Sequence, residues 1–221
     1  MIIDIKDKIK NINAFIGCNI GCRYCYAKAV ASRFHLTDDF SKPLAELRKL
    51  ERLRKRGVYF LTGMSDPYLW KKEWMDKTFA LLEESPKTVG IFLTKAPDNM
   101  HLDSVPDNAW MGVTVTCSKD LWRIKSLKEN INCKNYHVTF EPLFEDLGDI
   151  DLSGIRWIVI GTETGNCKGK IDAQKEWVEK LVAVARKYKC KIFFKEELAR
   201  KIMDGKNIVQ ELTPEMEEAL R

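Results

Sequence analysis

The sequence has no apolar run long enough to cross a membrane, no Gly/Ser/Pro-rich linker, no low-complexity tract and no internal repeat. Its first residues mix charged and apolar side chains, which is unlike a secretory signal peptide. These absences predict a soluble, cytoplasmic protein with no membrane partner, folded as a single domain over residues 1–221. A nucleophile elbow and a phosphate-binding loop are also absent from the sequence, so nothing indicates a plain α/β hydrolase or transferase.

Histidine is scarce, and no two of the three histidines stand at a spacing that indicates a metal site. The seven cysteines are an odd number in a chain without secretory features, so a disulfide framework is not expected. The charge balance is mildly basic, with 37 Lys and Arg against 32 Asp and Glu and a formal net charge of +5. This balance permits an anionic partner without requiring one.

Short apolar runs alternate with longer segments of helical periodicity, which is the pattern of a parallel sheet wrapped by helices. Some of the runs are continuously apolar, as expected of strands that are covered on both faces. Seven strands fall short of a complete eight-stranded barrel. We therefore predict an α/β fold, a partial (β/α)6-7 barrel of the TIM type whose parallel sheet is open on one side. Strands are predicted at 13–16, 58–62, 89–94, 110–115, 137–140, 157–161 and 191–194, and helices at 26–34, 42–56, 72–84, 120–129 and 173–189.

The predicted helix 42–56 is strongly basic and carries only two acidic residues. One interpretation is a solvated face opposite an apolar stripe, which is the usual meaning of a charge run. The other is a surface that contacts phosphates. Its basic residues are Arg48, Lys49, Arg52, Arg54, Lys55 and Arg56.

Three cysteines, Cys18, Cys22 and Cys25, stand within eight residues. A structural zinc site usually has two CxxC pairs, and no second pair exists here. Three thiolates on one short loop instead suit three corners of a 4Fe-4S cluster, which leaves the fourth iron open to a chelating ligand. Buried cysteines, or a zinc site completed by a distant His35, Cys117 or Cys167, are the alternatives.

Polar residues directly follow most of the predicted strands. In a parallel barrel the carboxyl ends of the strands meet at one rim, where ligands bind. The recurrence of such residues predicts a lined pocket at that rim. They are Ser65, Asp66, Thr94, Lys95, Thr114, Thr116, Glu141, Thr162, Glu163, Lys195 and Glu196.

The spacing CxxxCxxC, with an aromatic residue just before the third cysteine, resembles the signature of the radical S-adenosylmethionine (SAM) superfamily. More narrowly, the chain resembles an uncharacterised phage- and prophage-associated family of radical SAM-like proteins. A weaker likeness, through Ser65-Asp66-Pro67-Tyr68, is to the spore photoproduct lyases, which repair a DNA lesion. The stretches that carry the closer resemblance are 21–27, 64–66, 93–95, 112–115, 140–143, 159–165 and 193–195, with the turn Met203-Asp204-Gly205.

This resemblance implies an enzyme that uses a 4Fe-4S cluster and S-adenosyl-L-methionine. An external one-electron donor, flavodoxin- or ferredoxin-like, would reduce the cluster. SAM would then be cleaved to a 5′-deoxyadenosyl radical that abstracts hydrogen from the substrate, for which a nucleotide or nucleic acid is a candidate. The alternative of a different class is a non-catalytic iron–sulfur or zinc module that binds nucleic acid.

The resemblance also implies roles by position. The loop of Gly63, Met64 and Ser65 would meet the methionyl amine, and Lys95 or Lys195 would pair with the methionyl carboxylate. The cofactor-binding residues implied in this way are Tyr24, Gly63, Met64, Ser65, Lys95, Thr114, Thr116, Glu141, Gly161 and Lys195.

Catalytic roles are implied for Lys95 and for the acidic residues Glu141 and Glu163, which could serve the ribose, the substrate or a proton. Cys117 or Cys167 could donate a hydrogen atom to a product radical. The favoured alternative is that both thiols are bystanders, because a free cysteine usually behaves as a small apolar residue.

Overall fold

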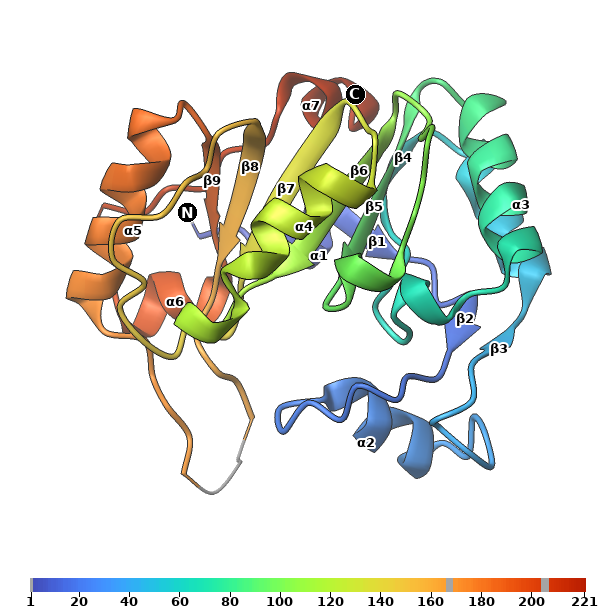
Figure 1. Ribbon diagram of the computed structural model, residues 1–221, viewed down its shortest axis with the longest axis horizontal. Helices are drawn as coiled ribbons and strands as arrows, with labels where there is room; N and C mark the ends of the chain where they lie inside the picture. Colours follow the sequence, from blue (N-terminus) through green and yellow to red (C-terminus); the bar gives the residue numbers. More distant parts are fainter. Residues whose placement is uncertain (1, 166–168, 204–206) are drawn as a thin grey trace.

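Seven strands form a single sheet that curls into a half-barrel in the computed structural model, which describes residues 2–165, 169–203 and 207–221 (Figure 1). All neighbouring strands pair in parallel, and their order in the sheet follows the chain. This confirms the predicted α/β partial barrel. In sheet order the strands are β1 (Ile9–Asn11), β4 (Gly57–Phe60), β5 (Thr88–Thr94), β6 (Ala109–Thr114), β7 (Asn135–Phe140), β8 (Ile155–Ile160) and β9 (Lys191–Phe194).

Helices follow most of the barrel strands along the chain, although none lies between β7 and β8, and the longer helices cover the outer face of the sheet (Figure 1). Four of the five predicted helices are confirmed to within a few residues, as α2 to α5. The α-helices are α1 (Ile5–Lys8), α2 (Tyr26–Arg33), α3 (Lys72–Glu83), α4 (Trp122–Asn130), α5 (Lys175–Lys187), α6 (Glu196–Lys201) and α7 (Pro214–Ala219), and the 3-10 helices are η1 (Leu47–Arg54), η2 (Pro67–Leu69), η3 (Pro97–Asn99) and η4 (Ser118–Asp120).

The sheet has an apolar layer on each face. Successive side chains of a strand point to opposite faces, so each strand supplies both layers. On the outer face, residues such as Phe92 and Ile158 pack against the helices. On the concave face, Trp110 and Trp157 belong to a second cluster, with ring centroids 6.5 Å apart. Burial on both sides explains why the strands read as continuous apolar runs.

The C-terminal segment closes the amino end of the half-barrel. Met216 and Ala219 of α7 are buried in the concave cluster, beside residues at the start of β4 and β5. The Gln210 side chain accepts a hydrogen bond from Ile3 N (2.8 Å) and donates to the carbonyl oxygens of Ile3 (2.7 Å) and Phe194 (2.9 Å). Gln210 therefore ties the segment before β1 to the last strand of the sheet.

The first barrel strand was predicted at the wrong place. The predicted strand 13–16 contains only β2 (Phe15–Ile16), which pairs antiparallel with β3 (Leu44–Ala45) outside the barrel. The strand that begins the barrel is β1, which was not predicted. It is three residues long and only Ile9 of it is buried, because it lies at the edge of the sheet and has little apolar pattern to detect.

The predicted helix 42–56 is also wrong as an α-helix. Residues 44–45 pair with β2, and residues 47–54 form the 3-10 helix η1. Leu50 and Leu53 are fully buried and three residues apart, which matches the three residues per turn of a 3-10 helix. Its basic side chains are engaged within the chain, since Arg48 and Lys49 pair with Glu46.

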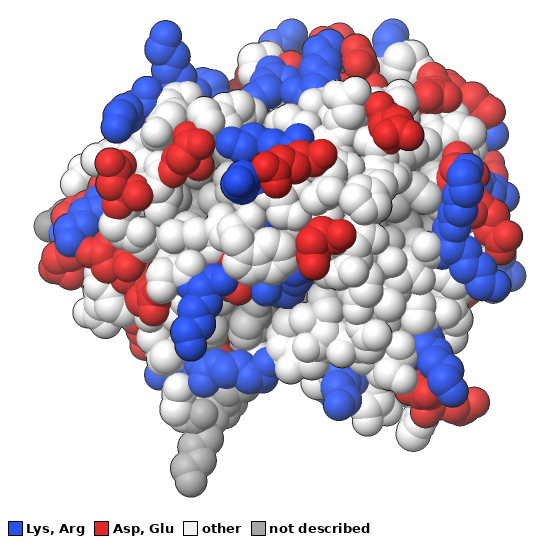
Figure 2. Space-filling view, viewed as in Figure 1, with Lys and Arg blue, Asp and Glu red and all other residues white. Residues whose placement is uncertain are grey.

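The charged surface is mixed. Basic and acidic side chains are intermixed on the face shown in Figure 2. Several helices also carry ion pairs between residues four positions apart. No helix among the described residues is both long enough and apolar enough to span a bilayer.

Candidate functional site

The cysteine loop is docked at the carboxyl end of β4. Gly17 N donates a hydrogen bond to Met64 O (3.0 Å), and Gly17 forms a parallel bridge with Ser65. The Tyr26 hydroxyl, just after the third cysteine, donates to Gly63 O (2.6 Å). Gly17 has a φ of 121°, and a Cβ there would lie 2.8 Å from Pro43 Cα, so only glycine fits this crossing. The loop predicted to meet the methionyl amine is therefore the one on which the cysteines rest.

The three motif cysteines are half-buried free thiols on this loop. Cys25 caps the amino end of α2, and its sulfur accepts a hydrogen bond from Lys28 N (3.4 Å). Burial is the main cause that raises the pKa of the Cys18 thiol, and the nearby Asp66 carboxylate and Cys22 thiol raise it further. The amino end of α2, which begins after Cys25, carries the positive end of the helix dipole and would stabilise an anionic group bound there.

The residues that the structure describes show no preformed site for a single metal ion. Among residues 2–165, 169–203 and 207–221, no three His, Cys, Asp or Glu side chains converge on a point that could hold one metal ion. In a 4Fe-4S cluster each thiolate binds a different iron, so its ligands need not share one coordination sphere. Nothing among the described residues supports a zinc site completed by His35 or Cys117, and Cys167 lies outside the described residues, as does the predicted turn from Asp204 onward.

Asp66 joins the ends of β4 and β5. It is buried, and its two oxygens accept hydrogen bonds from Thr94 Oγ1 (2.6 Å) and Lys95 N (2.9 Å). Burial raises its pKa above the usual value for a carboxyl group, although these hydrogen bonds act in the opposite direction. Asp66 and Thr94 therefore hold the rim together and leave the Lys95 side chain available.

A second contact joins β7 and β9. Lys195 Nζ lies 2.7 Å from Glu141 Oε1, and both side chains are partly exposed. Gly161, at the end of the intervening β8, makes room for this pair, since a Cβ there would lie 2.8 Å from Glu141 Cγ. The structure thus brings two of the predicted cofactor-binding residues, Lys195 and Glu141, into an ion pair.

The end of β6 carries two threonines with different surroundings. Thr116 donates its hydroxyl to Asp120 Oδ2 (2.8 Å), and Arg123 Nη1 contacts Asp120 Oδ1 (2.9 Å) and Thr114 O (2.9 Å). The Thr114 hydroxyl is buried and has no hydrogen-bond partner among the described residues. Buried hydroxyls normally have partners, so Thr114 is the threonine that a ligand would satisfy. Cys117 follows on the same loop and is half-buried.

Tyr24 is the residue of the cysteine loop that contacts both Phe144 and Lys95 of the rim. Its ring packs edge-on against Phe144 at 5.8 Å, and Lys95 Nζ lies 5.8 Å from the ring centroid. Burial, together with the nearby Cys22 thiol, raises the pKa of the Tyr24 hydroxyl well above its usual value. The structure thus brings Tyr24 and Lys95, two of the predicted cofactor-binding residues, into contact.

Two rim residues were not predicted. Arg23 Nη2 lies 2.6 Å from Glu163 Oε2, so the acidic residue predicted for catalysis is paired with the motif itself. Asn13 Oδ1 is buried without a partner among the described residues, close to Gly63. A polar residue inside the apolar run around Phe15 was the signal for Asn13. For Arg23 no signal existed, because its partner is 140 residues away.

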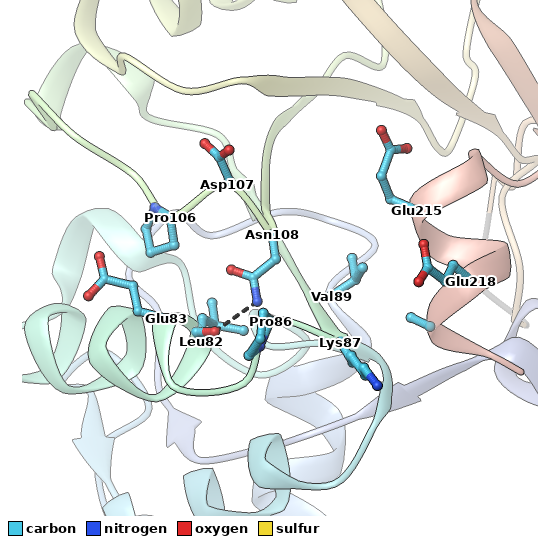
Figure 3. Close-up of a pocket in the computed structure, with 11 residues that line it drawn as sticks. Leu82, Glu83, Pro86, Lys87, Val89, Pro106, Asp107, Asn108, Glu215 and Glu218 are labelled. Carbon is cyan, nitrogen blue, oxygen red and sulfur yellow. Dashed lines mark hydrogen bonds between the residues drawn. The ribbon is translucent and has the colours of Figure 1, made fainter.

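A cavity of about 370 Å³ opens at the opposite end of the half-barrel (Figure 3). It lies between the end of α3, the starts of β5 and β6, and α7. Glu83, Asp107, Glu215 and Glu218 line it, with Lys87 as a basic neighbour. The amino end of such a barrel usually serves stability. The cavity is distant from the cysteine loop and contains none of the predicted site residues.

Comparison with known proteins identifies one family and one solved structure. The model of the family described as "Protein of unknown function (DUF5131)" matches residues 4–209, and no curated protein matches the chain. A cysteine variant of spore photoproduct lyase, solved with dinucleoside spore photoproduct, matches with a TM-score of 0.55 and 12% sequence identity. The match covers 84% of this chain and 76% of that chain. At this identity the likeness shows a shared fold, and the association with phages stays a prediction.

Proposed function

We propose that this chain, which belongs to the DUF5131 family of proteins of unknown function, is a radical SAM enzyme. The observation that carries the proposal is the place of Cys18, Cys22 and Cys25. All three lie on one loop that is hydrogen-bonded to the carboxyl end of a parallel half-barrel, in a fold shared with spore photoproduct lyase. That enzyme belongs to the radical SAM superfamily, which makes the same chemistry the first candidate here.

In this proposal the three cysteines hold a 4Fe-4S cluster whose fourth iron is left to SAM. When bound and reduced by an external flavodoxin- or ferredoxin-like donor, such a cluster would supply one electron for the cleavage of SAM into methionine and a 5′-deoxyadenosyl radical, which would take hydrogen from the substrate. The fold supplies the position of the ligands and the protection of the site from water.

The chain's own residues would bind and orient SAM. The Lys195 ammonium, oriented by Glu141, offers a charge-assisted contact to the methionyl carboxylate. The Gly63 and Met64 carbonyl oxygens already accept one hydrogen bond each, and each retains a second lone pair for the methionyl amine. The unpartnered Thr114 hydroxyl is the candidate contact for the ribose.

A nucleotide or nucleic acid is the substrate class that the rim favours. Large apolar side chains are exposed on the segments that follow the strands: Tyr26 (56%), Phe34 (61%) and Trp122 (46%). Lys28 and Arg33 of α2 form no ion pair among the described residues, and residues 18–37 contain no Asp or Glu. Exposed aromatic rings beside unpaired cations suit stacked bases and phosphates.

Anaerobic reconstitution with iron and sulfide, followed by dithionite and SAM, tests the proposal. We expect the release of 5′-deoxyadenosine and its loss in each of the variants Cys18→Ala, Cys22→Ala and Cys25→Ala. The matched control is Cys133→Ala, which removes a half-buried thiol at the start of β7 and should retain the release. A protein that binds zinc and yields no 5′-deoxyadenosine would overturn the proposal.

That outcome would favour the alternative of a non-catalytic module that binds nucleic acid. The basic segment 42–56 supports this alternative less than its composition suggested, because Arg48, Lys49 and Arg54 pair with glutamates of the chain. The exposed residues of α2 are what remains in its favour. Binding of a single-stranded oligonucleotide without any turnover would distinguish the module from the enzyme.

A further inference from the structure

The contact between Arg23 and Glu163 spans the mouth of the half-barrel. Arg23 belongs to the cysteine loop, which follows β1 and β2 at one edge of the sheet. Glu163 follows β8, which is the neighbour of β9, the strand at the opposite edge of the sheet. The two side chains meet at 2.6 Å across 140 residues of sequence. The ion pair therefore links the motif to a part of the sheet that β1 does not reach through strand pairing.

Glu163 is built into this position from several sides. Its side chain is 1% exposed, and Oε2 accepts hydrogen bonds from both Arg23 and Ile171 N (2.9 Å). Oε1 is buried and has no hydrogen-bond partner among the described residues. A buried carboxylate needs a compensating charge, so removal of Arg23 would leave Glu163 in an unfavourable state.

Arg23 is held by a second contact as well. Its guanidinium lies 4.7 Å from the ring centroid of Phe144, which follows β7, and Phe144 N donates to Thr116 O (3.0 Å). The Phe144 ring also contacts Tyr24, the next residue of the motif. Through two adjacent side chains, the loop thus contacts the segments that follow β7 and β8.

We propose that Glu163 is a positioning residue, which through Arg23 fixes the cysteine loop over the mouth of the half-barrel. The role differs from the direct part in catalysis that the sequence resemblance implies for Glu163. Only the effect of this positioning on a bound cluster rests on the proposed function. The contact between Arg23 and Glu163 is present in the chain without any cofactor. A variant that breaks the ion pair releases the loop and exposes the motif thiols.

The test measures the alkylation of Cys22 and Cys25 by iodoacetamide in the folded apoprotein, followed by mass spectrometry. We expect Glu163→Gln to accelerate alkylation by about fivefold or more, the factor expected for the loss of about 1 kcal/mol of loop stabilisation. Hydrogen exchange of residues 18–25 should accelerate in parallel. The charge-swapped pair Arg23→Glu with Glu163→Arg should recover slow alkylation, which a purely local packing defect would not allow.

The control is Glu215→Gln, which breaks the Arg156–Glu215 pair of the same 2.6 Å length at the amino end and should leave both motif thiols unchanged. Arg23→Gln is a second test variant, because the half-exposed Arg23 can be replaced without opening the core. Unchanged alkylation in Arg23→Gln and in Glu163→Gln would overturn the proposal. Since these measurements use apoprotein, they are independent of whether the reconstituted wild type releases 5′-deoxyadenosine, which decides the proposed function.

Discussion

Lys195 and Glu141 form an ion pair of 2.7 Å between the ends of β9 and β7, with Gly161 of the intervening segment beneath them. The two residues lie on the same rim as the docked cysteine loop. Among the described residues, Lys195 is the only rim lysine whose ammonium group is oriented by a carboxylate from the end of another strand.

We expect Lys195→Met to weaken SAM binding to the reconstituted protein by about tenfold, because it removes a charge-assisted hydrogen bond. Equilibrium dialysis with labelled SAM measures the change. Lys180→Met, which removes the surface ion pair between α5 and Asp146, is the control and should bind SAM as the wild type does. Equal affinity in both variants would mean that another cation holds the methionyl carboxylate.

Gly112→Ala should destabilise the fold by about 1–3 kcal/mol, the usual cost of forcing a methyl group into a packed interior. A Cβ at Gly112 would overlap the imidazole of the fully buried His137 on the neighbouring strand. Urea denaturation measures the loss. The double variant Gly112→Ala with His137→Ala should lose less stability than the sum of the two single losses, because the second change removes the overlapping ring. A loss equal to that sum would contradict the proposed overlap.

His137 should make the fold less stable in mild acid. Burial lowers its pKa to about 4 from 6.5, so the folded state keeps the imidazole neutral while the unfolded state takes up a proton. The contribution of neutral His137 is therefore present above pH 6.5 and is lost as the pH falls toward 4, by about 3 kcal/mol in total. Urea denaturation of the wild type and of His137→Gln at pH 7.0, 5.5 and 4.5 checks this. The stability difference between them should shrink with acidification, and a constant difference would argue against the buried neutral state.

Met216→Ala should cost about 2–5 kcal/mol, the range for truncating a fully buried large side chain to alanine. Met216 is the larger of the two α7 residues that are buried in the concave cluster at the amino end. The expected result is a lower denaturation midpoint, measured by circular dichroism. Glu217→Ala on the exposed side of α7 is the control and should change stability by less than about 0.5 kcal/mol.

The central strands could be predicted because each is buried on both faces, and a run such as Ile158-Val159-Ile160 carries that burial in its composition. The same signal failed at β1, an edge strand with one buried residue, and at η1, where three-residue spacing resembled helical periodicity. Helix α7 was missed because six residues hold too little pattern. Its stability comes from the concave cluster that it covers rather than from its own sequence.

The sequence by itself determined the three-cysteine loop and the polar residues after the strands, because ligand spacing and strand ends are local properties of the chain. Tertiary structure decided which of those residues meet. The curvature and register of the sheet place Lys195, rather than Lys95, against Glu141 and bring Arg23 of the motif to Glu163. Such pairs join residues far apart in sequence, and their choice depends on how seven strands are arranged around one mouth, which no local pattern encodes.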